Sequence, residues 1–175
     1  MHTSLVLTVI GPDRPGLVEA IAAVVARHGA NWEESRMAQL GGQFAGMLRV
    51  TASEETQDAL EDALAGLGSV GLKVTVARAA GAQAQVPKLL HLNLVGQDRP
   101  GIVREIAEAL ARRGVSIESL ETRCVSASMS GEMLFEAEAV LAVPPALAAD
   151  ELRTALEALA NELMVDLDLA EPAGA

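Results

Sequence analysis

A hexapeptide that occurs twice constrains the fold of this chain more than any other feature. The sequence GPDRPG occupies residues 11–16, and GQDRPG occupies residues 96–101, an offset of 85 residues. When residues 5–36 are laid over residues 90–121 without a gap, 14 of 32 positions are identical. Similarity of this length at one fixed offset is the signature of an internal repeat. We therefore expect two copies of one domain.

Hydrophobic periodicity predicts the same order of elements in each copy: a strand, a helix, two strands, a second helix and a closing strand. In the first copy the helix faces are expected at Leu17, Ile21, Val24 and Val25 and at Leu60, Leu64 and Leu67, with strands near 31–40 and 43–52 joined by Gly41-Gly42. In the second copy the two middle strands are expected near 115–127 and 131–142, joined by Ser130-Gly131, and the second helix at Leu152, Leu156, Leu159 and Leu163. Ser53 and Asp150 are the candidate caps of the second helices.

The order βαββαβ is that of the ferredoxin-like unit, in which two helices cover one face of a four-stranded sheet. Polar residues on the opposite face of the first strands, such as Thr8 and Asn93, favour an antiparallel or mixed sheet. We predict an α+β protein with two tandem domains at 1–78 and 89–175. The segment 79–88, AAGAQAQVPK, has the composition of a linker.

The charge of the chain argues against direct binding to nucleic acid. The net charge is −11, with 9 acids and 6 bases in residues 1–78 and 15 acids and 6 bases in residues 89–175. Such a surface repels a phosphate backbone. No apolar run is long enough to span a membrane, and the single Cys124 suits a reducing compartment, so we expect a cytoplasmic protein. We also expect Cys124 to be an inert structural thiol.

The two DRPG turns are the candidate functional sites. Gly11 lets the chain leave the strand tightly, Asp13 is placed to cap the helix, and Pro15 suits its first turn. A helix N-terminus with free N–H groups suits the carboxylate of an amino acid, which Arg14 could also bind unless it pairs with Asp13. Asn31 offers a donor and an acceptor for the rest of the ligand. The candidate ligand-binding residues are Gly11, Asp13, Arg14, Gly16 and Asn31 in the first copy and Gly96, Asp98, Arg99, Gly101 and Ser116 in the second.

On the residues alone, these turns are more simply explained as well-made helix caps that bind nothing. Caps of this kind are common, and a duplicated fold duplicates its caps. The histidines are too far apart in sequence to indicate a metal site, and no nucleophile motif is present. We expect neither catalysis nor a cofactor or metal.

The sequence resembles the ACT domains, and among them the glycine-cleavage-system transcriptional repressor family, whose proteins are two ACT domains in tandem. The resemblance lies in LTVIGPDRPGLVEAIAAVVARHGANWEESRMAQLGGQFAGMLRV at 7–50, and more generically in LNLVGQDRPGIVREIAEALARRGVSIESLETR at 92–123. Trp32 stands where an aliphatic residue is more usual, and Ser116 replaces the Asn of the first copy.

The resemblance implies a sensor of glycine or a similarly small amino acid. ACT domains pair side by side, within one molecule or between two, and bind the ligand at the seam, so we expect a homo-oligomer. The family further implies regulation through a protein partner that is a DNA-binding transcription factor, rather than through direct DNA contact. Two alternatives remain: a regulatory subunit that controls a metabolic enzyme, and an interaction module without a ligand.

The outer face of the second sheet is expected to be acidic. If the strands take the usual ferredoxin-like order, Glu136, Glu138, Asp166 and Asp168 point outward with His91 among them. Such a face is either simply solvated or a docking surface for a basic partner.

Overall fold

The computed structural model describes residues 2–79, 86–127 and 131–172. The chain divides into unit 1, Met1–Ala82, and unit 2, Gln83–Ala175. Each unit has the predicted order βαββαβ, and unit 1 adds a short 3-10 helix. The predicted α+β class is confirmed.

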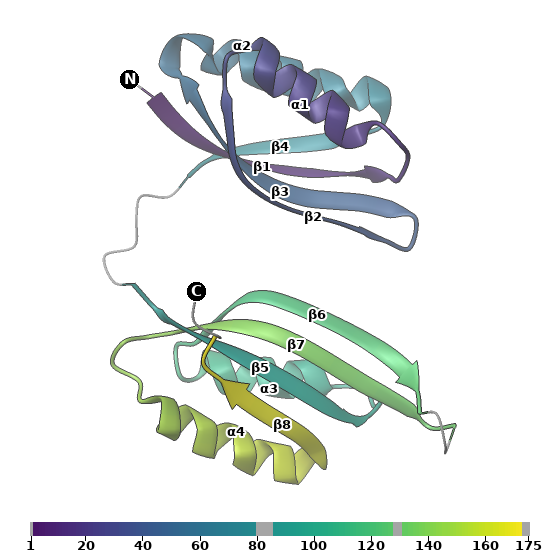
Figure 1. Ribbon diagram of the computed structural model, residues 1–175, viewed down its shortest axis with the longest axis vertical. Helices are drawn as coiled ribbons and strands as arrows, with labels where there is room; N and C mark the ends of the chain where they lie inside the picture. Colours follow the sequence, from purple (N-terminus) through teal and green to yellow (C-terminus); the bar gives the residue numbers. More distant parts are fainter. Residues whose placement is uncertain (1, 80–85, 128–130, 173–175) are drawn as a thin grey trace. The chain divides into compact units, whose positions relative to one another are not determined.

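Unit 1 is a four-stranded antiparallel sheet with the strand order β2-β3-β1-β4. Helices α1 and α2 lie on the same face of the sheet (Figure 1). The elements are β1 (His2–Pro12), α1 (Leu17–Arg27), β2 (Asn31–Leu40), β3 (Gln43–Ser53), α2 (Glu54–Ala65), the 3-10 helix η1 (Gly66–Val70) and β4 (Lys73–Arg78).

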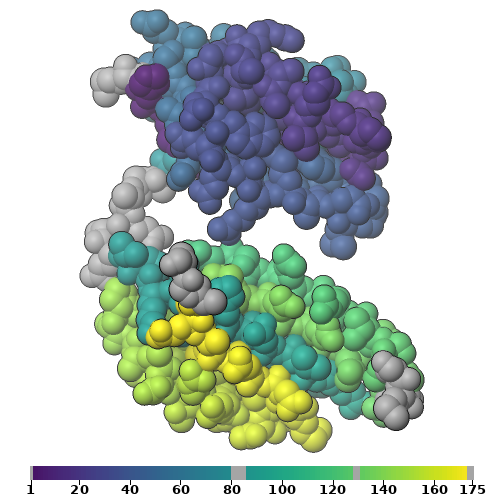
Figure 2. Space-filling model, viewed as in Figure 1, coloured from purple at the N-terminus to yellow at the C-terminus, as the bar shows by residue number. Residues whose placement is uncertain are grey.

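Unit 2 repeats this arrangement with the strand order β6-β7-β5-β8, again antiparallel. Helices α3 and α4 cover one face, and β8, in yellow, lies at the surface of the unit (Figures 1 and 2). The elements are β5 (Lys88–Gln97), α3 (Ile102–Ala111), β6 (Ser116–Ser126), β7 (Met133–Val143), α4 (Ala149–Leu163) and β8 (Val165–Ala170).

The core of each unit lies between the sheet and its helices. Side chains alternate between the faces of a strand, so the apolar alternation of β1 and β5 turns one set of residues toward the helices. Leu5, Leu7 and Val9 have no exposed surface. The predicted apolar stripe of α1 is buried against them, and Ile102, Ile106 and Leu110 of α3 do the same in unit 2. The outer face of each sheet carries no helix.

The helix boundaries differ from prediction in three places. Leu67 belongs to η1 rather than to α2, because α2 ends at Ala65. Ser53 is the N-cap of α2, but its hydroxyl oxygen lies 2.9 Å from the Thr56 hydroxyl and caps no backbone N–H. Asp150 lies within the first turn of α4, whose N-cap is Ala148. The predicted turn residue Ser130 lies outside the described residues, whereas Gly41 and Gly42 form the β2–β3 turn.

A close approach of two backbones fixes the end of each first strand. A methyl group on Gly11 would collide with the carbonyl oxygen of Gly71, just before β4. A methyl group on Gly96 would collide with the side chain of Val165 at the start of β8. The last strand of each unit therefore begins in direct contact with the strand end that enters the DRPG turn.

We predict that Gly11→Ala destabilises unit 1 by about 1–3 kcal/mol, because the added carbon forces the backbone of Gly71 away. Gly66→Ala is the matched control, since Gly66 has an ordinary helical φ of −62° and open space around it. Urea unfolding measures both variants. A Gly11→Ala variant as stable as Gly66→Ala would contradict the close approach.

Candidate functional site

The first DRPG turn, residues 11–16, ends on a glycine that starts helix α1. Gly16 is the N-cap and has φ 92° and ψ 0°, a left-handed conformation that glycine adopts at little cost. No side chain caps α1, so the prediction that Asp13 caps it is wrong: Asp13 stands three residues before the N-cap. Pro15 also precedes the helix, rather than lying in its first turn. The N–H groups that open α1 therefore lack a side-chain acceptor.

Two hydrogen bonds hold this turn in place. The backbone N–H of Asp13 donates to the carbonyl of Gly42 at 2.9 Å, which ties the turn to the β2–β3 loop. Arg14 Nη2 donates to the carbonyl of Val70 in η1 at 2.6 Å, so its partner is not Asp13. Both side chains are exposed. The site is thus an open surface with one cation, whose present partner is a neutral carbonyl.

The second DRPG turn, residues 96–101, has the same backbone but a different partner for its arginine. Gly101 is the N-cap of α3 with φ 98° and ψ −8°, again without a side-chain cap. The Asp98 N–H donates to the carbonyl of Met133 at 3.0 Å. Arg99, however, binds Glu105 through two hydrogen bonds of 3.2 Å, from Nη1 to Oε1 and from Nη2 to Oε2. The cation of this turn is therefore already paired with a carboxylate.

The charges at the second turn shift three ionisation equilibria. The hydrogen bond from Arg99 lowers the pKa of Glu105, and the same bond raises the pKa of Arg99. Both groups are therefore charged at neutral pH. Desolvation, followed by the charge of Asp98 and a hydrogen bond to it, raises the pKa of Cys124. The exposed Cys124 is thus held as a thiol next to the turn. This protonation state favours the predicted inert thiol.

Asn31 and Ser116 lie at the far end of their units from the DRPG turns. Asn31 pairs with Thr51, which pairs with Ser4 of β1. The turn follows Pro12, about eight residues and roughly 25 Å further along the strand. Ser116 stands in the corresponding place on β6, at the opposite end of α3 from the second turn. Within one unit, the structure does not bring these residues to the turn.

Two partners of the turns escaped the sequence-based prediction. Val70 lies in η1, which is too short to show a period. Glu105 lies on α3, at a position where the aligned residue of the first copy is Ala20. The signal in the sequence that points to Glu105 is this difference between the two repeats, alanine in one and glutamate in the other.

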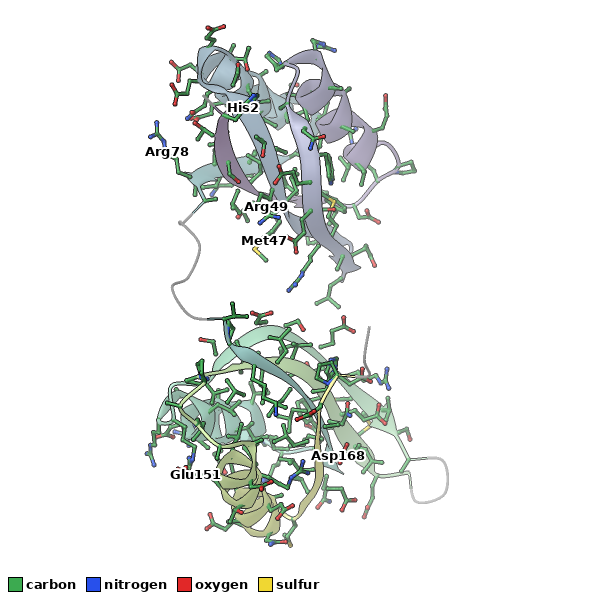
Figure 3. The ribbon with its side chains drawn as sticks, turned by 60° about the vertical axis from the view of Figure 1, so that its left-hand side comes forward. His2, Met47, Arg49, Arg78, Glu151 and Asp168 are labelled. Atoms are coloured by element: carbon green, nitrogen blue, oxygen red, sulfur yellow. The ribbon has the colours of Figure 1, made fainter. Side chains whose placement is uncertain are left out.

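The outer face of the second sheet is acidic, as its alternation predicted. Glu138, Asp166 and Asp168 are exposed, and Asn93 pairs with Glu138 on one side and with Asp168 on the other. Asp168 is labelled in Figure 3. Glu136 is half-buried and accepts a hydrogen bond of 2.5 Å from Arg123 Nε. The face therefore keeps an excess of carboxylates.

The outer face of the first sheet has a different character. Met47 and Arg49 project from it, away from the helices (Figure 3). The Arg49 guanidinium pairs with Glu33 at 3.1 Å and with Glu34 at 3.3 Å. Its charge is therefore already balanced by neighbouring carboxylates.

No group of three or more His, Cys, Asp or Glu side chains within residues 2–79, 86–127 and 131–172 is arranged to hold a metal ion. In those same ranges, no helix combines the length and apolar character needed to cross a membrane.

Comparison with known proteins places both units in one family. Two family models, each described as an ACT domain, match residues 3–76 and 91–161. The solved structure of an unknown protein from Galdieria sulphuraria is 34% identical, with a TM-score of 0.84, and covers 99% of this chain and 100% of that one.

The chain is also similar to proteins named for one regulatory system. It is 26% identical over 164 residues to the glycine cleavage system transcriptional repressor of Escherichia coli (strain K12), covering 91% of this chain and 85% of that protein. A crystal structure described as that of a "putative glycine cleavage system transcriptional repressor" has a TM-score of 0.72 at 23% identity over 97% of this chain and 96% of that one, which supports the fold. The chain belongs to the ACT-domain family and consists of two ACT domains in tandem.

Proposed function

We propose that the chain is a non-catalytic regulator that binds a small amino acid, such as glycine, at its DRPG turns. The observation that carries this proposal is the geometry of the first turn. The N–H groups that open α1 have no side-chain cap, and an exposed arginine stands beside them with only a carbonyl partner. A carboxylate would satisfy both, because it accepts hydrogen bonds and complements the positive end of the helix dipole.

A single unit could not hold a ligand that uses both the first turn and Asn31. The turn is exposed, and Asn31 lies at the other end of α1. A ligand that uses both must therefore contact two domains, which supports a side-by-side pairing of ACT domains in a homo-oligomer. Because Asn31 is exposed at the start of β2, one of the two edge strands of its sheet, it is accessible to a neighbouring domain.

The output of the regulator is proposed to pass through a protein contact, to a DNA-binding transcription factor. The similarity to proteins named glycine cleavage system transcriptional repressor supports this role. The charge of the chain supports the indirect route, since a net charge of −11 and an acidic outer sheet face oppose contact with DNA phosphates.

Glycine is expected to stabilise the protein against heat. A ligand at one hundred times its dissociation constant adds about 2.7 kcal/mol to the stability of the state that binds it, which moves the midpoint by several degrees. Thermal unfolding against a panel of amino acids measures this shift. A flat panel would contradict amino-acid sensing and favour the interaction module without a ligand.

Arg14→Gln is expected to reduce the shift that glycine causes, because the carboxylate loses its cation at the first turn. Arg27→Gln is the matched control, since it removes the same charge from the exposed last turn of the same helix. Each variant is compared with its own ligand-free midpoint, because Arg14 also holds Val70. Equal reductions of the glycine-induced shift in the two variants would indicate that glycine binds away from the first turn.

The purified protein is expected not to bind duplex DNA at low salt, where phosphate contacts are strongest. Fluorescence anisotropy of a labelled duplex carrying a glycine-cleavage promoter measures this directly. Saturable, salt-dependent binding by the protein alone would contradict the indirect route and leave the amino-acid site unaffected.

A further inference from the structure

The two DRPG turns differ in the group that holds their arginine. Arg14 donates to the neutral carbonyl of Val70, whereas Arg99 is clamped by both oxygens of the Glu105 carboxylate. A bidentate arginine–carboxylate pair is also the contact that an amino-acid ligand would make. The arginine of the second turn therefore already binds a carboxylate of its own chain, which is the group that the first turn is proposed to bind from a ligand.

One substitution between the repeats supplies the carboxylate of the second turn, while the carbonyl that Arg14 uses belongs to η1, an element of unit 1. Ala20 and Glu105 occupy the same place in α1 and α3, and their backbone N–H groups donate to Gly16 and Gly101 at 3.0 Å in both units. The backbones thus agree at the helix starts, and at this helix position the side chain differs. Alanine has no group that could reach the arginine, while glutamate reaches back over the first turn of its helix.

The Glu105 carboxylate lies close to the start of the helix as well as to the arginine. A carbon added to Gly101 would lie 3.4 Å from Glu105 Oε1, whereas a carbon added to Gly16 would meet nothing within 4 Å. The space beside the N-cap glycine is therefore open in unit 1 and bordered by a carboxylate oxygen in unit 2. Because Arg99 lowers the pKa of Glu105, that oxygen carries negative charge at neutral pH.

We propose that Glu105 is a built-in competitor for the carboxylate of the ligand at the second DRPG turn. The first turn is then the principal amino-acid site of the chain, and the second binds the same ligand several-fold more weakly. This inference rests on the proposed function, since it ranks the affinities of the two proposed sites. Exposed ion pairs are weak, so the competition amounts to roughly a fivefold factor in affinity rather than a complete block.

The experiment titrates the ¹⁵N-labelled full-length chain with glycine and follows the backbone amide signals of Gly16 and Gly101. Each amide reports its own turn, so one titration gives two dissociation constants. In the unmodified protein the Gly16 signal is expected to saturate at the lower glycine concentration. Glu105→Gln is expected to tighten binding at Gly101 about fivefold and to leave Gly16 unchanged.

The reciprocal variant transfers the competitor to the other unit. Ala20→Glu is expected to weaken binding at Gly16 about fivefold without changing Gly101. Glu108→Gln is the control, because it removes the same charge from the same helix, where Glu108 pairs with Arg112 and not with the turn. It is expected to change neither constant.

The outcomes separate this inference from the proposed function. Suppose that both amides respond to glycine but that Glu105→Gln leaves the affinity reported by the Gly101 amide unchanged or weakens it. The competitor role of Glu105 is then overturned, and the sensing function stands. Weakening would mean that Glu105 binds the ammonium group of glycine instead. If neither amide responds at saturating glycine, glycine sensing at these turns is overturned, and the inference falls with it.

Discussion

Each unit depends on the close contact between the end of its first strand and the start of its last one. The backbone of Gly71 leaves no room for a side chain at Gly11, and Val165 leaves none at Gly96. This contact fixes the position at which the strand gives way to the DRPG turn. The turn can then present its helix start to solvent without a capping side chain, because the backbone bonds of Asp13 and Asp98 hold it from the hairpin side.

The same scaffold carries two different electrostatic environments. Both N-cap glycines are left-handed, and both aspartates donate the same type of backbone bond. The arginine of unit 1 nevertheless stays next to a neutral carbonyl, and that of unit 2 is neutralised by Glu105. The two copies thus share the backbone of the turn and helix start, and they differ in the η1 carbonyl of unit 1 and in the carboxylate of Glu105 in unit 2.

Much of the fold could be predicted from the sequence, and the site only in part. Alternation in the strands and the apolar stripes of the helices depend on burial, so β3, with its alternating buried residues, was predicted within one residue of its observed bounds. The capping role of Asp13 was wrong, since a left-handed glycine moves the helix start three residues further on. The contact of Arg14 with Val70 joins residues 56 positions apart and leaves no local pattern. Glu105 was visible in the sequence, but its meaning depends on the geometry of the turn.

The central claim is that the carboxylate of a small amino acid binds at the start of α1, beside Arg14. A crystal structure of the protein grown with saturating glycine tests it most directly. The account predicts glycine at the first DRPG turn, with its carboxylate within hydrogen-bond distance of the N–H groups that open α1 and of the Arg14 guanidinium. Glycine bound away from both turns, or turns that stay empty at saturation, would contradict it.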